Sequence, residues 1–155
     1  MGDQELYATA AGTKGGLASY TILTMPTHEM PATDQRNFIV ARMLRSLRRD
    51  NDFYRLIEAS AYWDLYGKYV VERLLADQRT KVRLAVLSDE PDVILGFALY
   101  RDNVLDYVYV LRDQRNIGIA TRLVPTGIDT ITHLTKDGLS IWGSKYGYWK
   151  FNPFA

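Results

Sequence analysis

The chain of 155 residues contains no cysteine and only two histidines, His28 and His133. Without cysteine there is no disulfide scaffold, no thiol nucleophile and no thiolate metal ligand. Two histidines are too few for a histidine-based metal site. We therefore expect neither a bound metal nor covalent catalysis by a thiol.

Long hydrophobic runs and an excess of one charge are also missing. No stretch approaches the roughly 18 apolar residues of a membrane-spanning helix. The N-terminus has neither the basic start nor the apolar run of a secretory signal. Lys and Arg number 19 against 18 Asp and Glu, a net charge of +1, whereas general nucleic-acid binding favours a basic excess. We expect a cytoplasmic protein, with no membrane and no nucleic acid among its partners.

What the chain does have is a normal hydrophobic share of 47%, enough for one domain with its own core. Residues 1–16 are small and polar and end in the glycines Gly12, Gly15 and Gly16, which predicts a flexible N-terminal arm. The other interpretation of this segment is an arm that orders on a partner. Residues 17–155 are expected to form the single folded domain.

The first half of that domain is expected to begin with a strand and continue with helices. Residues 17–25 are β-rich and lie between glycine and Pro26. Thr33 or Asp34 can cap a helix whose apolar residues recur at helical spacing up to Leu47, and residues 53–78 repeat that spacing with a break at Gly67.

Two features of these helices allow more than one interpretation. Arg42, Arg45 and Arg49 are spaced for one helical face, which is either solvated or directed at phosphate or nucleic acid. The second feature is an aromatic cluster that forms either core or the wall of a substrate groove; it comprises Tyr62, Trp63, Tyr66 and Tyr69.

The second half changes to strands. Residues 81–88, 93–100 and 104–111 are β-rich and are separated by short polar turns, which predicts an antiparallel meander. A short helix over 117–124, a strand over 128–134, a helix over about 136–146 and a last strand over 146–154 are expected to follow. The whole pattern indicates a mixed α and β fold.

The polar loop after this meander is the segment most suggestive of chemistry. The third strand of the meander ends at Val110, a polar loop follows, and Gly118 opens a helix. Glycine lets the backbone approach a ligand closely, and the first amides of a helix have no internal partner, so they suit phosphate oxygens. Arg115 adds positive charge. The pattern predicts an anion site for a diphosphate, although it is neither a Walker loop nor the dinucleotide fingerprint.

The segment RNIGIA, Arg115 to Ala120, resembles the coenzyme A loop of the GNAT acyltransferase superfamily, Arg/Gln-x-x-Gly-x-Gly/Ala. The spacing from Val110 to Arg115 is also that of the family, and the resemblance covers about residues 81–150. It implies an α+β fold with a mixed, mostly antiparallel central sheet flanked by helices. The TITHLT segment and the NPF ending are similar to small GNAT-like proteins encoded by bacteriophages.

The resemblance implies an N-acyltransferase that moves an acetyl group from acetyl-coenzyme A directly to a primary amine of a small molecule or a protein. No covalent enzyme intermediate is needed. Strand residues would pair with the pantetheine arm and loop amides would hold the diphosphate. These cofactor-binding residues are Val108, Tyr109, Val110, Arg115, Asn116, Ile117, Gly118, Ile119, Ala120 and Thr121.

Three residues are candidates for proton transfer. A lysine-like amine costs about 4.6 kcal/mol to deprotonate at pH 7, so a base is useful. Asp106, on the strand that precedes the loop, is the first candidate, and His133 is the second because its ordinary pKa suits pH 7. The family places an acidic tyrosine on its last helix, and Tyr146 lies closest to that position, near Trp142.

A second class of function stays open. Because no tyrosine stands in register at that position, the chain is alternatively an inactive GNAT-fold assembly protein of a phage particle. Its contacts with a homo-oligomer or particle would use the N-terminal arm and the C-terminus. A phage origin would place it in the host cytoplasm or the virion. A third hypothesis is nucleic-acid binding through the arginines at 42–49.

Overall fold

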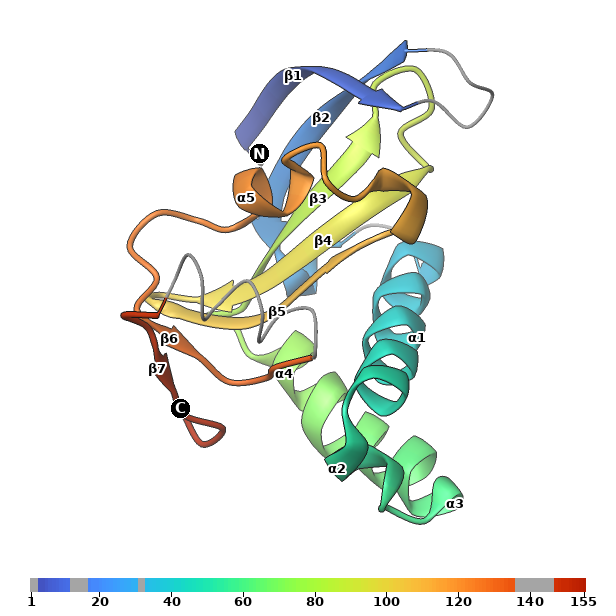
Figure 1. The fold of residues 1–155 in the computed structure, drawn as a ribbon, viewed down its shortest axis with the longest axis vertical. Helices are drawn as coiled ribbons and strands as arrows, with labels where there is room; N and C mark the ends of the chain where they lie inside the picture. The colour runs from blue at the N-terminus through green and yellow to red at the C-terminus, as the bar shows by residue number, and fades with distance from the viewer. Residues whose placement is uncertain (1–2, 12–16, 31–32, 136–146) are drawn as a thin grey trace.

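A computed structural model describes residues 3–11, 17–30, 33–135 and 147–155. In these residues seven strands form one sheet whose spatial order is the order of the chain (Figure 1). The first five pair antiparallel, whereas β6 lies parallel to β5 and β7 parallel to β6. The strands are β1 (Asp3–Ala11), β2 (Leu17–Pro26), β3 (Lys81–Leu87), β4 (Ile94–Arg101), β5 (Val104–Val110), β6 (Thr130–Ile131) and β7 (Lys150–Phe151).

Two groups of helical segments connect the strands. A long helical passage runs between β2 and β3, and a short one follows β5. The first comprises η1 (Thr27–Glu29), α1 (Thr33–Asp50), α2 (Asp52–Arg55), α3 (Ala59–Ala61), the π-helical η2 (Tyr62–Glu72) and α4 (Arg73–Ala76). The second comprises η3 (Arg112–Gln114) and α5 (Ile119–Leu123). The mixed α and β class and the mostly antiparallel sheet expected from the sequence are therefore confirmed.

The central strands are buried on both faces because their alternate side chains enter two separate cores. In β3, Val82 and Leu84 point to the core under α1, while Ala85 and Leu87 point to the core under α5. Phe97 and Ala98 divide in the same way on β4. This explains why the strands read as nearly continuous apolar runs in the sequence.

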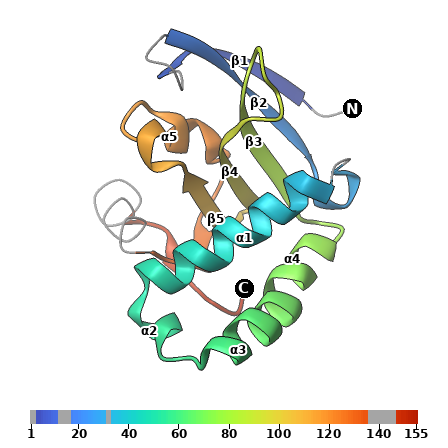
Figure 2. The ribbon, with the colours of Figure 1, turned by 90° about the vertical axis from the view of Figure 1, so that its right-hand side faces the viewer.

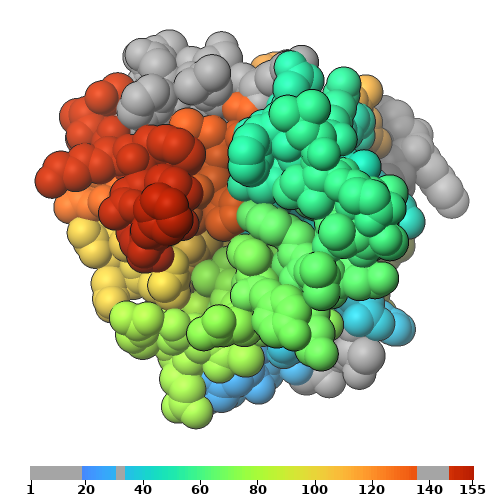
Figure 3. All heavy atoms as spheres, turned by 90° about the horizontal axis from the view of Figure 1, so that it is seen from below, coloured from blue at the N-terminus to red at the C-terminus, as the bar shows by residue number. Residues whose placement is uncertain are grey.

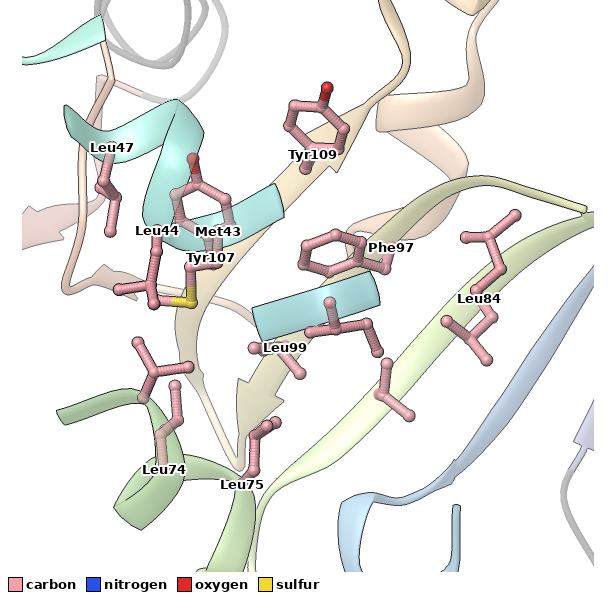
Figure 4. Close-up of a cluster of buried hydrophobic side chains, with 14 of the residues drawn as sticks. Met43, Leu44, Leu47, Leu74, Leu75, Leu84, Phe97, Leu99, Tyr107 and Tyr109 are labelled. Carbon is pink, nitrogen blue, oxygen red and sulfur yellow. The ribbon is translucent and has the colours of Figure 1, made fainter. Parts of the chain in front are cut away.

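Helix α1 covers one face of the sheet together with α4, as Figure 2 shows. Its buried residues Ile39, Met43 and Leu47 recur every four positions, so they form one stripe along the helix. Figure 4 shows this stripe meeting the aromatic side chains of the sheet, among them Phe97 and Tyr107. Each fully buried side chain of this size stabilises the fold by about 1.5–3 kcal/mol.

Helix α5 covers the other face through Ile119 and Leu123, both buried. It comes close to the sheet because Gly96 lies beneath it, opposite Val110 of β5. A Cβ at Gly96 would lie 2.6 Å from the Tyr109 carbonyl oxygen and 3.1 Å from a Leu123 methyl carbon. Because residue 96 has no side chain, α5 and the loop before it can pack directly on the sheet at this point.

Some expected elements differ in extent, and one was wrong. The flexible arm over 1–16 is corrected: Asp3–Ala11 forms β1, because its backbone pairs antiparallel with β2. The strand expected over 128–134 is limited to Thr130–Ile131, and the last one to Lys150–Phe151. The helix expected over about 136–146 lies outside the described residues.

The remaining segments agree with expectation within a few residues. The three meander strands and the helix beginning at Thr33 lie where they were predicted. The helix expected over 53–78 is divided into α2, α3, η2 and α4, with Gly67 inside η2. No helix of the described ranges has the length and apolar character needed to cross a membrane.

We predict that Gly96→Ala lowers the free energy of unfolding by about 1–3 kcal/mol, because the added methyl group collides with rigid backbone of β5. Urea unfolding measures this change. Gly67→Ala is the control, since its Cβ would meet only the end of the Leu44 side chain, at 3.3 Å, and alanine favours helix. Equal stability of the two variants would contradict this account of how α5 packs on the sheet.

Candidate functional site

The loop between β5 and α5 has an unusual backbone. Asn116 and Gly118 both have positive φ, 65° and 88°, a region that asparagine tolerates and glycine favours. Both residues are exposed. Among the hydrogen bonds of the described residues, none is donated by the backbone amides of 116–121. Backbone donors of this kind, at the exposed residues 116–118, can receive an anion.

Arg115 stabilises this loop from within. Its Nε donates to the Val110 carbonyl oxygen at 2.9 Å, and its guanidinium lies 5.8 Å from the centre of the Tyr109 ring. The side chain therefore folds back along the end of β5. Its positive charge lies beside the loop, and its hydrogen bond to Val110 stabilises the turn between β5 and α5.

Strand β5 has an edge that is only partly paired. On the side away from β4 it pairs with β6 at Val104 and Leu105 alone. The Leu111 amide donates to Leu95, so in this antiparallel pair the backbone groups of Val108 and Val110 face away from β4. No strand of the described residues pairs with this second half of β5. The Val110 carbonyl oxygen accepts from Arg115, which leaves the amide and carbonyl of Val108 and the amide of Val110 for a ligand with amide character.

The end of the β5–β6 pairing is marked by a buried carboxylate. Asp106 is 1% exposed and accepts two hydrogen bonds from Arg101, at 2.7 and 2.8 Å. The Thr132 hydroxyl donates to the same carboxylate at 3.0 Å. The ion pair raises the pKa of Arg101 and compensates the cost of burying both charges. The carboxylate is thus held by β4 and by the chain after β6.

His133 continues this network toward the helices. Its Nδ1 lies 2.9 Å from the Thr132 hydroxyl and its Nε2 lies 2.6 Å from the Tyr66 hydroxyl. The Tyr66 oxygen lies 3.3 Å from that of Tyr54. Burial lowers the pKa of His133, against the opposing effect of Asp106. Asp106 and His133, selected separately from the sequence, are therefore joined through Thr132.

The backbone after β6 is also drawn to the helical layer. The Asn51 side-chain amide donates to the Leu134 carbonyl oxygen at 2.9 Å, at the junction of α1 and α2. Seen from below in Figure 3, atoms around residue 130 (orange) lie between the green helical segment and the red C-terminal residues. The hydrogen-bonded residues thus lie where three parts of the chain meet.

The aromatic cluster of Tyr62, Trp63, Tyr66 and Tyr69 was expected to form either core or the wall of a substrate groove, and its members differ in this respect. Tyr62 is fully buried, and its hydroxyl donates to the Leu44 carbonyl oxygen, so it belongs to the core. Tyr66 stacks on Tyr62 with ring centres 5.4 Å apart, but its hydroxyl meets His133. Trp63 and Tyr69 are exposed.

The other expected site residues are placed as follows. Val108 and Ala120 are half-buried, Ile117 and Thr121 are exposed, and the Tyr109 and Ile119 side chains are buried in the two cores. Only backbone of the last two can therefore reach a ligand. Tyr146 lies outside the described residues. His28 is exposed, 3.8 Å from Glu29.

Sequence reasoning did not select Arg101, Thr132 or Tyr66 as site residues. Tyr66 was noted only as one aromatic among several, and Thr132 only as part of the TITHLT segment. A usable signal exists for one of them: Arg101 and Asp106 flank the same hairpin turn, so opposite charges were bound to lie close. In the described ranges no group of three or more His, Cys, Asp or Glu is arranged to hold a metal.

Comparison with known proteins adds no assignment. A scan against protein-family models, a search of curated proteins and a search of solved structures each find no match to this chain. A functional assignment therefore depends on the geometry of the site.

We predict that His133 makes stability depend on pH in the mildly acidic range. Its pKa in the folded chain lies below the ordinary value of 6.5. As the pH falls through 6.5, the unfolded chain binds a proton that the folded chain does not, so the free energy of unfolding falls until the folded-state pKa is reached. Urea unfolding between pH 7.5 and 5 measures this loss.

His133→Gln is expected to remove that part of the pH dependence, while His28→Gln, at the exposed histidine, is expected to keep it. Identical slopes for His133→Gln and the unaltered chain would show that the buried imidazole is not responsible.

Proposed function

We propose that this protein is an acyl-coenzyme A-dependent N-acyltransferase of the GNAT type, which transfers an acetyl group to a primary amine. One observation supports this most directly: the second half of β5 has an edge that no strand of the described residues pairs with, and it leads into the amides of 116–121, which donate no hydrogen bond within those residues. Pantetheine carries amide groups that can pair with such an edge, and the diphosphate fits the amides that follow.

The space above Gly118 agrees with this use. A Cβ there would meet no atom closer than 3.9 Å, and that atom belongs to the Arg122 guanidinium. The backbone at Gly118 is thus open to a group of the size of a phosphate. The order of elements, with antiparallel strands up to β5, a short helix and then a parallel strand, is also compatible with the GNAT resemblance.

The direction of the bound thioester follows from this arrangement. If the diphosphate lies at the loop after Val110, the pantetheine arm runs back along β5 toward Asp106, about 13 Å away at 3.3 Å per residue. The thioester would then lie near Asp106, Thr132 and His133. The amine attacks the thioester carbon, the carbon–sulfur bond breaks, and the amine proton must leave.

We predict that Gly118→Ala weakens acetyl-coenzyme A binding about tenfold, equivalent to about 1.4 kcal/mol, because its Cβ enters the diphosphate position. Isothermal calorimetry measures the affinity. Gly127→Ala is the matched control: its φ of 84° is close to the 88° of Gly118, and its Cβ meets nothing within 4 Å. Both variants thus carry similar backbone strain, which urea unfolding can verify.

Equal affinities of the two variants would argue against a diphosphate at Gly118. No heat and no thermal shift of the unaltered chain at millimolar acetyl-coenzyme A would end the proposal.

A separate observation favours the alternative of an assembly protein. The helical passage from α2 to η2 exposes several large apolar side chains, of which Leu56 is 85% and Phe53 66% exposed. Figure 3 shows this passage (green) along one side of the lower face. Exposed apolar groups gathered on one passage are typical of protein contact surfaces. We propose this surface, with Leu65 and Tyr69, as the contact if the chain works in an assembly.

We predict that the chain then self-associates at micromolar concentration and that Leu56→Glu makes it monomeric, because a carboxylate would be buried in the contact. Light scattering reports the mass. Glu58→Gln, a change of charge at an exposed residue nearby, is the control. A monomer at every concentration, in the unaltered chain as in Leu56→Glu, would exclude self-association through this surface.

A further inference from the structure

The hydrogen-bonded series from Asp106 to Tyr66 has a defined direction. A carboxylate only accepts, so the single Thr132 hydroxyl hydrogen goes to Asp106. The Thr132 oxygen must then accept from His133, which places the imidazole hydrogen on Nδ1. In the neutral ring Nε2 is left as an acceptor. The Tyr66 hydroxyl has a single hydrogen and two acceptors in reach, His133 Nε2 at 2.6 Å and the Tyr54 oxygen at 3.3 Å, so the shorter contact takes the hydrogen.

This series begins at the end of the β5–β6 pairing. The Thr132 amide donates to the Leu105 carbonyl oxygen at 3.1 Å, and the unpaired edge of β5 starts directly beyond. His133 and Tyr66 are both half-buried, so neither is sealed inside the core. Tyr66 also belongs to the π-helical η2, a backbone form that is rare and frequent at functional sites.

We propose that the Tyr66 hydroxyl, backed by His133, carries the proton between the attacking amine and the leaving thiolate. This inference rests on the proposed function. In this proposal Tyr66 is the catalytic residue, the one that would contact the reacting nitrogen and sulfur. His133 stores the proton, and Thr132 and Asp106 are positioning residues that hold the imidazole hydrogen on Nδ1.

The proton balance of the step closes without another reactant once the amine is neutral, its ammonium proton having gone to the solvent. As the amine attacks, its proton passes to the Tyr66 oxygen while the Tyr66 hydrogen passes to His133 Nε2. When the carbon–sulfur bond breaks, Tyr66 gives a proton to the thiolate and recovers one from His133. The products are the amide and the free coenzyme A thiol, and the imidazole returns to its neutral form.

The charged and titratable groups around His133 suit this role. Burial raises the pKa of Tyr66, so the hydroxyl does not ionise alone and exchanges protons only in concert with its partner. Asp106 faces the imidazole through Thr132, and its negative charge stabilises the transient imidazolium, while Arg101 opposes it. Tyr54, Tyr62 and Tyr107 are the other titratable groups that influence Tyr66.

Nuclear magnetic resonance of the ligand-free chain tests the hydrogen placement. The imidazole ¹⁵N shifts of His133 at neutral pH are expected to show a protonated Nδ1 and an unprotonated Nε2. Thr132→Val removes the acceptor and is expected to abolish this preference, whereas Thr132→Ser keeps the hydroxyl and the preference. A proton on Nε2 in the unaltered chain would overturn the inference, whether or not acetyl-coenzyme A binds.

Kinetics tests the proton transfer, with acetyl-coenzyme A and butylamine as probes and release of the free thiol as the signal. Tyr66→Phe is expected to lower kcat at least 100-fold, with KM for acetyl-coenzyme A unchanged. Tyr69→Phe removes a hydroxyl from an exposed tyrosine of the same element η2; it is the control and is expected to keep kcat. In the unaltered chain kcat should fall below the His133 pKa measured by resonance, and Tyr66→Phe should lose that dependence.

The outcomes separate the two proposals. Failure of acetyl-coenzyme A to bind overturns the proposed function and, with it, the catalytic role of Tyr66. Binding with no turnover of the probes by the unaltered chain overturns the transferase activity together with the role of Tyr66. Turnover with equal kcat in Tyr66→Phe and Tyr69→Phe overturns only the role of Tyr66.

Discussion

The buried charge of Asp106 is the constraint on which this part of the structure depends. An isolated carboxylate with 1% exposure would be strongly destabilising, so it requires partners from outside its own strand. Arg101 supplies the opposite charge across the β4–β5 hairpin, and Thr132 supplies a hydroxyl from the chain after β6. The same requirement that stabilises the carboxylate therefore fixes where β6 meets β5.

The edge of β5 that no strand of the described residues pairs with has a related cause. Beyond Thr132 the chain does not continue along β5, because His133 bonds to Tyr66 and the Leu134 carbonyl accepts from Asn51. Both partners belong to the helical layer, which draws the two residues away from the strand. The bonds that end the β5–β6 pairing thus also place the histidine and the tyrosine beside the edge that they expose.

These long-range bonds explain what the sequence could and could not predict of the fold. The meander followed from local alternation and short turns such as that at Asp102, whose positive φ suits aspartate. The strand expected over 128–134 was too long because the local apolar pattern does not indicate the hydrogen bonds that Asn51 and Tyr66 form with Leu134 and His133. The prediction of a flexible arm over 1–16 was wrong because β1 forms by pairing with β2, and a segment of small, polar residues does not indicate that pairing.

The candidate site divides in the same way. Asp106 and His133 could be selected by residue type alone, but Thr132 joins them, and Tyr66, 67 positions before His133, meets it only in the folded structure. That connection changes the role of Asp106. Because Arg101 and Thr132 occupy the carboxylate, it is poorly placed to take a proton from an amine itself. In the proposed reaction it would instead orient the imidazole. An amine that costs about 4.6 kcal/mol to deprotonate at pH 7 would then meet a base whose own hydrogen is already on the far nitrogen.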